Sequence, residues 1–218
     1  MKNFIKELFI AIYFFIISIL SSVLIIFNST FIYKMCINFF NIEIISGIQK
    51  DLLIEDYKKI ISYVTNPFVK ELKLDNFVMS STGEFHFWEV KNIVFIIEVI
   101  FLILLIVGII LFLLNRNNKF KLPINSLNYL FFFTVIVVFF ILIFIYFDFT
   151  FVFDKFHKIL FNNDYWIFNP ITDPIIKALP EEFFMVCGVI CLFITLLVGI
   201  ISKFIYINLK KKYYKNVS

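Results

Sequence analysis

Four long apolar stretches dominate the chain, and each is free of charge over nearly its whole length. They cover residues 8–33, 99–115, 122–147 and 183–202. About 20 apolar residues cross a hydrocarbon core as a helix, so each stretch can span once, the second when it begins near Ile93. The pattern predicts an all-α integral membrane protein with four transmembrane helices and a small extracytoplasmic cap formed by the two long outer segments.

Composition supports lipid as the solvent for much of the chain. Of 218 residues, 61% are hydrophobic and 21% aromatic, whereas soluble domains have about 45–50% apolar residues. Lys2 and Lys6 precede the first stretch, which is longer than a signal-peptide core of roughly 7–15 residues and has no small-x-small cleavage site after it. It is therefore interpreted as an uncleaved anchor.

Charge is distributed unevenly between the segments that flank the spans. The N-terminal stub, the loop 115–121 and the tail together carry +9, whereas 34–91 and 148–182 carry −1 and −3. Lys and Arg are retained on the cytoplasmic side, so both termini are expected in the cytoplasm of a bacterium. The predicted order is a cytoplasmic stub with transmembrane helix 1 (1–33), an extracytoplasmic cap segment (34–92), transmembrane helix 2 (93–114), a cytoplasmic loop (115–124), transmembrane helix 3 (125–147), an extracytoplasmic motif segment (148–182), transmembrane helix 4 (183–203) and a basic cytoplasmic tail (204–218).

The cap segment contains an amphipathic pattern at helical spacing over 51–65. Its apolar positions are Leu53, Tyr57, Ile60, Ile61 and Val64, and its polar positions are Glu55, Asp56, Lys58 and Lys59. Asn66-Pro67 ends this predicted helix. Such a helix either lies in the membrane interface or packs on the ends of the spans, and a structural cap is the simpler interpretation.

The chain has two histidines, His86 and His157, and both fall in the outer segments. Residues 80–83 are expected to form a loop before a helix that begins at Glu84, on which Glu89 can reach His86 at i+3. Asp154 and Lys158 share a predicted helical face with His157. A turn at 162–164, helix starts at Asn169-Pro170 and Asp173-Pro174, and a fourth span from Glu181 follow. Both histidines could equally be interfacial residues beside anchoring tryptophans.

Three kinds of chemistry are poorly supported by the spacing. No HExxH or comparable zinc-ligand pattern is present, and Ser80, Ser81, Thr82 and Thr150 lie in no nucleophile motif. Glu98 is an intramembrane acid, but the spans lack the paired Gly/Pro breaks of a transporter, so it is expected to support the outer site or a contact between helices. The remaining possibility uses the two imidazoles as general acid and base, with the nucleophile supplied by the substrate.

Two outer motifs resemble those of the bacterial lipoprotein intramolecular transacylase (Lit) family. Residues 81–93 read Ser-Thr-Gly-Glu-Phe-His-Phe-Trp-Glu-Val-Lys-Asn-Ile. Residues 153–184 run from Phe-Asp-Lys-Phe-His to Pro-Glu-Glu-Phe-Phe and form the more specific match. Phe87 stands where the family has methionine and Glu89 where it has aspartate. The four spans and the cytoplasmic termini also fit, so the resemblance covers the whole chain.

The resemblance implies a defined reaction and needs no cofactor or metal. The family moves the sn-2 acyl chain of a diacylglyceryl-cysteine lipoprotein to the α-amine of the same cysteine, which gives the lyso form. His86 is assigned as base and His157 as acid, although nothing in the sequence orders them. Confinement by aromatic side chains such as Phe85, Phe87 and Tyr165 would exclude water. The supporting or substrate-binding candidates are Ser81, Glu84, Trp88, Glu89, Lys91, Phe153, Asp154, Phe156, Asn162, Asn163, Asp164, Trp166 and Asp173.

The expected partners are a diacylated lipoprotein and membrane lipid, with no nucleic acid. Asn162, Asn163 and backbone amides are the candidate oxyanion donors. Two alternatives stay open at this point, namely a hydrolase or other acyltransferase acting on lipids of the outer leaflet, and a non-enzymatic membrane scaffold. The sequence does not predict an oligomeric state.

Overall fold

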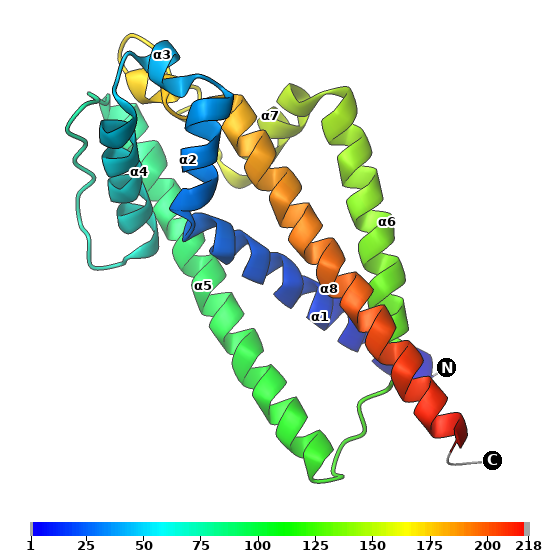
Figure 1. The fold of residues 1–218 in the computed structure, drawn as a ribbon. Helices are drawn as coiled ribbons and strands as arrows, with labels where there is room; N and C mark the ends of the chain where they lie inside the picture. Colours follow the sequence, from blue (N-terminus) through cyan, green and yellow to red (C-terminus); the bar gives the residue numbers. More distant parts are fainter. Residues whose placement is uncertain (1, 216–218) are drawn as a thin grey trace. The chain divides into compact units, whose positions relative to one another are not determined.

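The computed structural model describes residues 2–215, and these residues form helices and connecting segments without a strand. Figure 1 labels the helices in chain order. They are α1 (Lys2–Phe27), α2 (Thr30–Phe39), α3 (Ile42–Ser46), α4 (Lys50–Thr65), α5 (Ser81–Arg116), α6 (Asn125–Phe147), α7 (Phe149–Leu160), the short 3₁₀ helix η1 (Pro174–Lys177) and α8 (Glu181–Lys215).

Four of these helices, α1, α5, α6 and α8, are long and apolar enough to cross a membrane. Helices satisfy their own backbone groups, which lipid cannot do, so long apolar stretches fold this way. The predicted all-α membrane fold with four spans is confirmed. The start of the fourth span at Glu181, after Pro180, also agrees with the prediction.

Three predicted boundaries are wrong. The first apolar stretch does not continue as one helix to residue 33, because α1 ends at Phe27 and Ser29 has extended backbone angles. Asn28 Nδ2 donates to the Leu24 carbonyl at 2.8 Å, which satisfies a terminal carbonyl and competes with helix continuation. Residues 81–83 are helical instead of a loop, and Asn169-Pro170 lies in a turn instead of starting a helix.

The chain packs as two units, of which the first takes Met1–Val23, Val99–Ile143 and Val189–Ser218. Tyr13 Oη donates to the Leu104 carbonyl at 2.6 Å, and Gly108 leaves room for that phenol. Ser22 Oγ lies 3.2 Å from Thr195 Oγ1 within the same unit. Small and hydroxylated residues thus bring the backbones of this unit close together, as in other helix packings in lipid.

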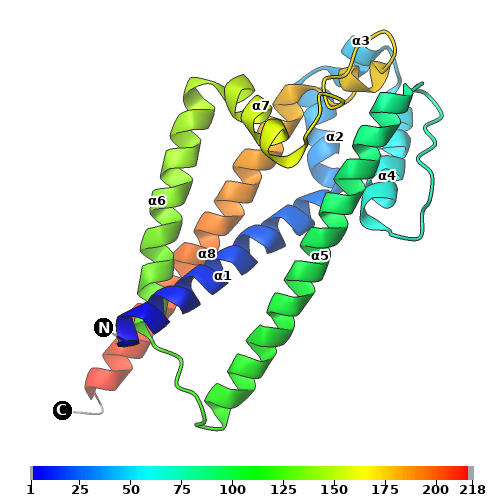
Figure 2. The ribbon, with the colours of Figure 1, turned by 180° about the vertical axis from the view of Figure 1, so that it is seen from behind.

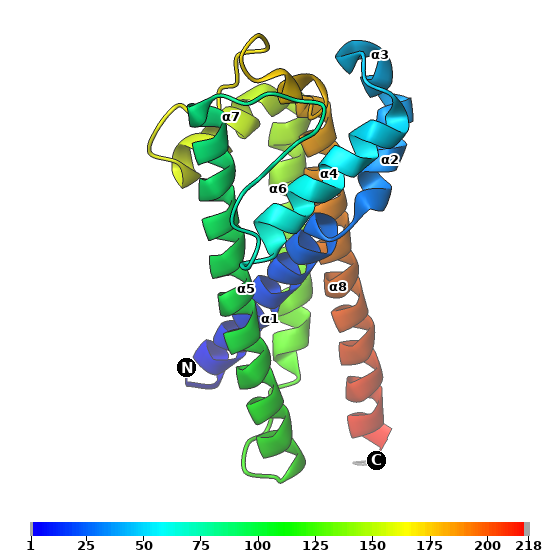
Figure 3. The ribbon, with the colours of Figure 1, turned by 90° about the vertical axis from the view of Figure 1, so that its left-hand side faces the viewer.

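The second unit takes Leu24–Glu98 and Phe144–Gly188, and it holds both histidines. Its core includes Tyr33 and Tyr57, whose rings stack at 4.0 Å, and the Tyr33 hydroxyl donates to the Ala178 carbonyl at 2.9 Å. Figure 3 shows α4 beside the N-terminal part of α5, with residues 66–80 running as an extended connection between them. The predicted apolar face of α4 is confirmed by the burial of Leu53, Tyr57, Ile60 and Val64, with Ile61 half-buried.

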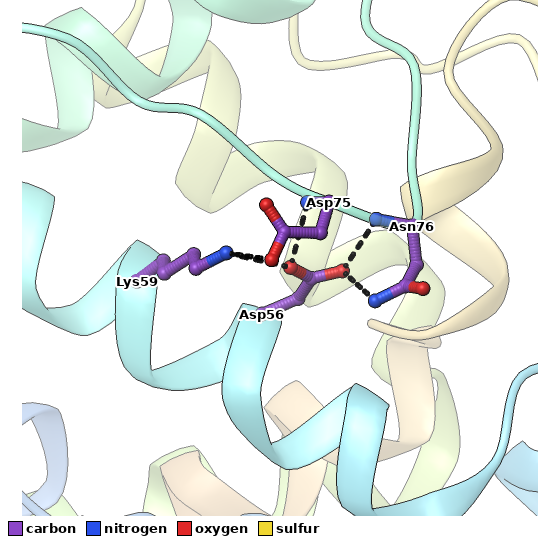
Figure 4. A network of polar contacts seen from close by, with 4 residues as sticks. All are labelled: Asp56, Lys59, Asp75 and Asn76. Carbon is purple, nitrogen blue, oxygen red and sulfur yellow. Dashed lines mark hydrogen bonds and ion pairs between the residues drawn. The ribbon is translucent and has the colours of Figure 1, made fainter.

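Asp56 departs from the predicted polar face of α4, because it is only 1% exposed. Its carboxylate accepts hydrogen bonds from Asp75 N, Asn76 N and Asn76 Nδ2 at 3.0–3.1 Å (Figure 4). Lys59 pairs with Asp75, and this hydrogen bond raises the pKa of Lys59. A buried carboxylate needs hydrogen-bond donors. Residues 75–76 supply them to Asp56, and these hydrogen bonds allow its carboxylate to be buried.

Candidate active site

The two histidines lie on helices whose starts are capped. Asp148 precedes α7, and its side chain accepts a hydrogen bond from Phe151 N at 2.9 Å. His157 lies in the last turn of the same helix. At the start of α5, the Asp173 carboxylate accepts from Ser80 N and Ser80 Oγ at 2.7–2.9 Å. Carboxylates stabilise helix N-termini through unpaired N–H groups and the helix dipole. Asp173 therefore ties the second outer segment to the helix that carries His86.

The structure brings His86 and His157 together, with ring centroids 6.1 Å apart. Figure 2 shows the end of α7 and the loop that follows it beside the N-terminal part of α5. His86 is 8% exposed and His157 is half-buried. One small group placed between the rings could exchange protons with both imidazoles.

Aromatic rings surround the histidine pair. Phe161 contacts both imidazoles, with centroids at 4.7 Å from His86 and 5.8 Å from His157. Trp166 stacks on His157 at 4.7 Å, and Phe168 lies 5.6 Å from His86. Trp166 was predicted, whereas Phe161 and Phe168 were missed. The i,i+4 spacing of Phe161 from His157 was the one signal that could have indicated it.

The orientation of the His157 ring is fixed by the backbone of its own helix. Nδ1 lies 2.7 Å from the Phe153 carbonyl oxygen, and the two rings lie 4.1 Å apart. A carbonyl only accepts, so Nδ1 carries a proton and Nε2 of the neutral ring carries the lone pair. Burial lowers the pKa of His157, although the Phe153 hydrogen bond, Asp154 and Glu181 oppose this shift. His157 is therefore neutral at pH 7, with Nε2 ready to accept a proton.

Glu89 lies between Asn163 and His86. Its Oε1 accepts from Asn163 Nδ2 at 2.8 Å, and its Oε2 lies 4.0 Å from His86 Nδ1. That separation is too long for a direct hydrogen bond. Oε2 and Nδ1 are both buried and have no hydrogen-bond partner among the described residues. The predicted i+3 proximity of Glu89 to His86 is present, without direct contact between the two groups.

The other candidate residues have smaller parts in this site. Phe156 packs edge-on against His157 at 5.4 Å, while Asp154 acts on it only through its charge. Lys91 donates to the Val69 carbonyl and lies over the Tyr63 ring at 4.5 Å, so it fixes the connection between α4 and α5. Four predicted residues have exposed side chains, namely Ser81, Glu84, Asn162 and Asp164.

Trp88 is 50% exposed and packs on Phe85 instead of on either histidine. Glu98 lies twelve residues beyond His86, which is about 18 Å along the helix, so it does not support the outer site. Ser80 Oγ donates to the Asp173 carboxylate and accepts from Gly83 N, so this side chain caps the start of α5. Within residues 2–215, no three His, Cys, Asp or Glu side chains gather as metal ligands.

A family model described as "Lipoprotein intramolecular transacylase Lit" matches residues 8–184. The match covers well over half of the chain and includes both histidines and the aromatic residues around them. The chain belongs to the Lit family. It is thus a lipoprotein intramolecular transacylase by family, and the prediction of an acyltransferase enzyme is confirmed. No curated protein sequence matches the chain.

Solved structures of a Lit protein agree with this assignment. The membrane-integral lipoprotein intramolecular transacylase Lit from Bacillus cereus is 28% identical, and the match covers 100% of this chain and 99% of that chain with a TM-score of 0.89. Two variants of the Bacillus cereus protein, each with a histidine replaced, are also 28% identical. The alanine variant has a TM-score of 0.81, with 100% of this chain and 96% of that chain covered. The arginine variant has a TM-score of 0.80, with 99% and 96% covered.

Proposed function

We propose that this Lit family member moves the sn-2 acyl chain of a diacylglyceryl-cysteine lipoprotein to the α-amine of the same cysteine. The observation that carries the proposal is the pair of His86 and His157, 6.1 Å apart inside an aromatic enclosure. The substrate supplies both the nucleophile and the ester, so the protein needs no nucleophile of its own. An ester-to-amide transfer is downhill, and the reaction needs no metal or acyl carrier.

Two protons have to leave the substrate nitrogen during the reaction. An α-amine has a pKa of about 7.7–8.0, so it arrives as an ammonium at neutral pH. His86 takes the first proton, and the neutral amine then attacks the ester carbonyl carbon. His157 Nε2 takes the second proton from the attacking nitrogen and delivers it to the sn-2 oxygen as the C–O bond breaks. The first proton finally passes from His86 to solvent, so one proton is released for each amide formed.

The tautomer of His157 supports this order. Its Nδ1 is held by the Phe153 carbonyl at 2.7 Å, so only Nε2 can exchange a proton with substrate. One ring nitrogen that accepts a proton from a nucleophile and returns it to a leaving group is the logic of the serine-protease histidine. His86 is then the base for the ammonium, and His157 is the acid for the departing oxygen.

The aromatic enclosure supports transfer over hydrolysis. Phe161 is buried and contacts both imidazoles, and Trp166 covers one face of His157. Such rings exclude water from the ester carbonyl, while the amine of the same molecule is held against it. Bringing reacting groups into an attack geometry can contribute roughly 7–11 kcal/mol. The Asn163 side-chain amide uses one N–H on Glu89, and its second N–H is the one we assign as a candidate oxyanion donor.

The charge distribution supports a site on the extracytoplasmic face. The stub, the 115–121 loop and the tail carry +9 in total, which favours both termini in the cytoplasm. The segments that hold the histidines then lie outside the bacterial cytoplasmic membrane. Mature lipoprotein N-termini would meet the site there, together with membrane lipid.

Expression in a host that makes diacylated lipoproteins tests the function. Mass spectrometry of the N-terminal lipopeptide should show one acyl chain on nitrogen with no change in mass. His86→Ala and His157→Ala should each lower the rate by roughly 10²–10⁴-fold, whereas Glu55→Gln, on the exposed face of α4, should not. Loss of an acyl chain would indicate a hydrolase, and an unmodified lipoprotein would indicate a scaffold.

A further inference from the structure

Two buried polar atoms face each other in the site without a hydrogen-bond partner among the described residues. Glu89 Oε2 and His86 Nδ1 lie 4.0 Å apart, and neither makes a hydrogen bond to any described residue. Buried polar atoms in folded proteins are nearly always paired, so an unpaired couple of this kind indicates a group that is bound from outside. With the proton of the neutral His86 ring on Nε2, Nδ1 is an acceptor like the carboxylate oxygen, and the bound group then offers donors to both atoms at once.

The other oxygen of Glu89 shows that the carboxylate is held in place. Oε1 accepts from Asn163 Nδ2 at 2.8 Å, and Asn163 is in turn fixed because its Oδ1 accepts from Tyr165 N at 2.9 Å. The side chain of Glu89 therefore cannot turn freely to reach the His86 ring. Its second oxygen is positioned for a ligand.

The spacing fits a primary ammonium. The two atoms are 4.0 Å apart, so a nitrogen to one side of the line that joins them can lie about 2.8–2.9 Å from each. This is the ordinary length of a charge-assisted hydrogen bond. A carboxylate oxygen and an imidazole lone pair are both acceptors, which suits a group with several N–H donors and a positive charge. A phosphate or another carboxylate would be repelled by Glu89.

We propose that Glu89 Oε2 and His86 Nδ1 together bind the protonated α-amine of the substrate's N-terminal cysteine. This inference rests on the proposed function, and it identifies the element of the substrate that the site selects. An ammonium bound to Nδ1 directs one of its N–H groups at the same ring nitrogen that later accepts the proton. Lipids that lack a primary amine at this position would lack these two contacts and bind more weakly.

The test uses two synthetic diether lipopeptides that cannot transfer an acyl chain. Both carry ether-linked alkyl chains on the glyceryl group, one has a free N-terminal amine and the other lacks the amino group. At pH 6.5 the wild-type protein should bind the amine peptide roughly ten- to a hundredfold more tightly. Glu89→Gln, which removes the charge of one of the two contacts at nearly constant shape, should reduce this ratio by roughly tenfold. Equal affinity of the variant and wild type for the des-amino peptide shows that the site is folded.

Glu55→Gln is the matched control, because Glu55 is exposed on α4 and has to keep the wild-type ratio. A Glu89→Gln ratio equal to that of wild type overturns the proposal. So does a ratio near one in the wild-type protein, which is decisive even if the variant fails to fold. Acyl transfer on the corresponding diester peptide is measured in parallel. Wild-type transfer without amine preference overturns only this inference, whereas amine preference without transfer overturns the proposed function.

Discussion

Asn163 donates a 2.8 Å hydrogen bond from its side-chain amide to Glu89, across 74 positions of sequence. The Asn163 carbonyl also accepts from Trp166 Nε1 at 3.1 Å, and Trp166 stacks on His157. One asparagine thus holds a residue beside each histidine. The loop after α7 positions the site through hydrogen bonds as well as through ring packing.

Asn163→Ala should slow acyl transfer by roughly tenfold or more, because the Glu89 carboxylate loses the donor that orients it. Initial rates with a diester lipopeptide, measured at equal amounts of folded protein, test this prediction. Asn169→Ala is the control in the same loop, since its side chain accepts only from Ile171 N at 2.9 Å. Equal rates for the two variants would show that the Asn163 contact does not matter for activity.

Acyl transfer should fall on the acid side with a midpoint below pH 6.5, the ordinary pKa of histidine. Burial lowers the pKa of His157, and the protonated ring has no lone pair at Nε2 for the attacking nitrogen. The groups that act on this ring are His86, Asp154 and Glu181. The profile of kcat/KM against pH reports the free enzyme. Asp154→Asn removes a charge that favours protonation, so it should move the midpoint to still lower pH, and an upward shift would contradict the assignment.

Phe161→Ala should change the product and not only the rate. The buried Phe161 ring contacts both imidazoles, so its removal admits water to the ester. Mass spectrometry should then show lipopeptide that has lost one acyl chain beside the transferred product. Phe68→Ala is the control, because Phe68 is 88% exposed. Unchanged products from Phe161→Ala would refute water exclusion by this ring.

Gly83→Ala should destabilise the second unit by about 1–3 kcal/mol, since a Cβ at this position would collide with the Asp173 carboxylate that holds Ser80 at the start of α5. Gly188 is the matched helical position, because a Cβ added there would have no neighbouring atom within 4 Å. Gly188→Ala should therefore be neutral or stabilise by about 0.5–1 kcal/mol. Thermal unfolding in detergent measures both variants. The prediction fails if they shift the midpoint in the same direction.

Asp56→Ala should release the connection between α4 and α5. Three N–H donors on residues 75–76 lose their acceptor, at a cost of about 2 kcal/mol or more. Hydrogen exchange at the Asp75 and Asn76 amides should accelerate, and protease should cut 66–80 faster. Asp51→Ala, at an exposed position in the first turn of α4, should leave both rates close to wild type.

Local patterns were sufficient for much of the fold. Apolar length predicted the four spans, the 3.6-residue period predicted the buried face of α4, and Asp173-Pro174 and Pro180-Glu181 marked helix starts correctly. These features depend on residues within a few turns of each other. The sequence prediction extended the first helix wrongly over residues 28–33. An apolar composition does not show that the Asn28 side chain donates to the Leu24 carbonyl at the end of α1.

By itself, the sequence determined the membrane class, the four helices and the family motifs around the two histidines. Only the tertiary structure decided that His86 and His157 lie 6.1 Å apart, that Phe161 lies against both, and that Asp56 is buried. Periodicity reports which side of a helix is apolar, but not which distant segment covers it. The site is built from contacts between residues about 70 positions apart, and those depend on how α5, α7 and the loop after α7 pack together.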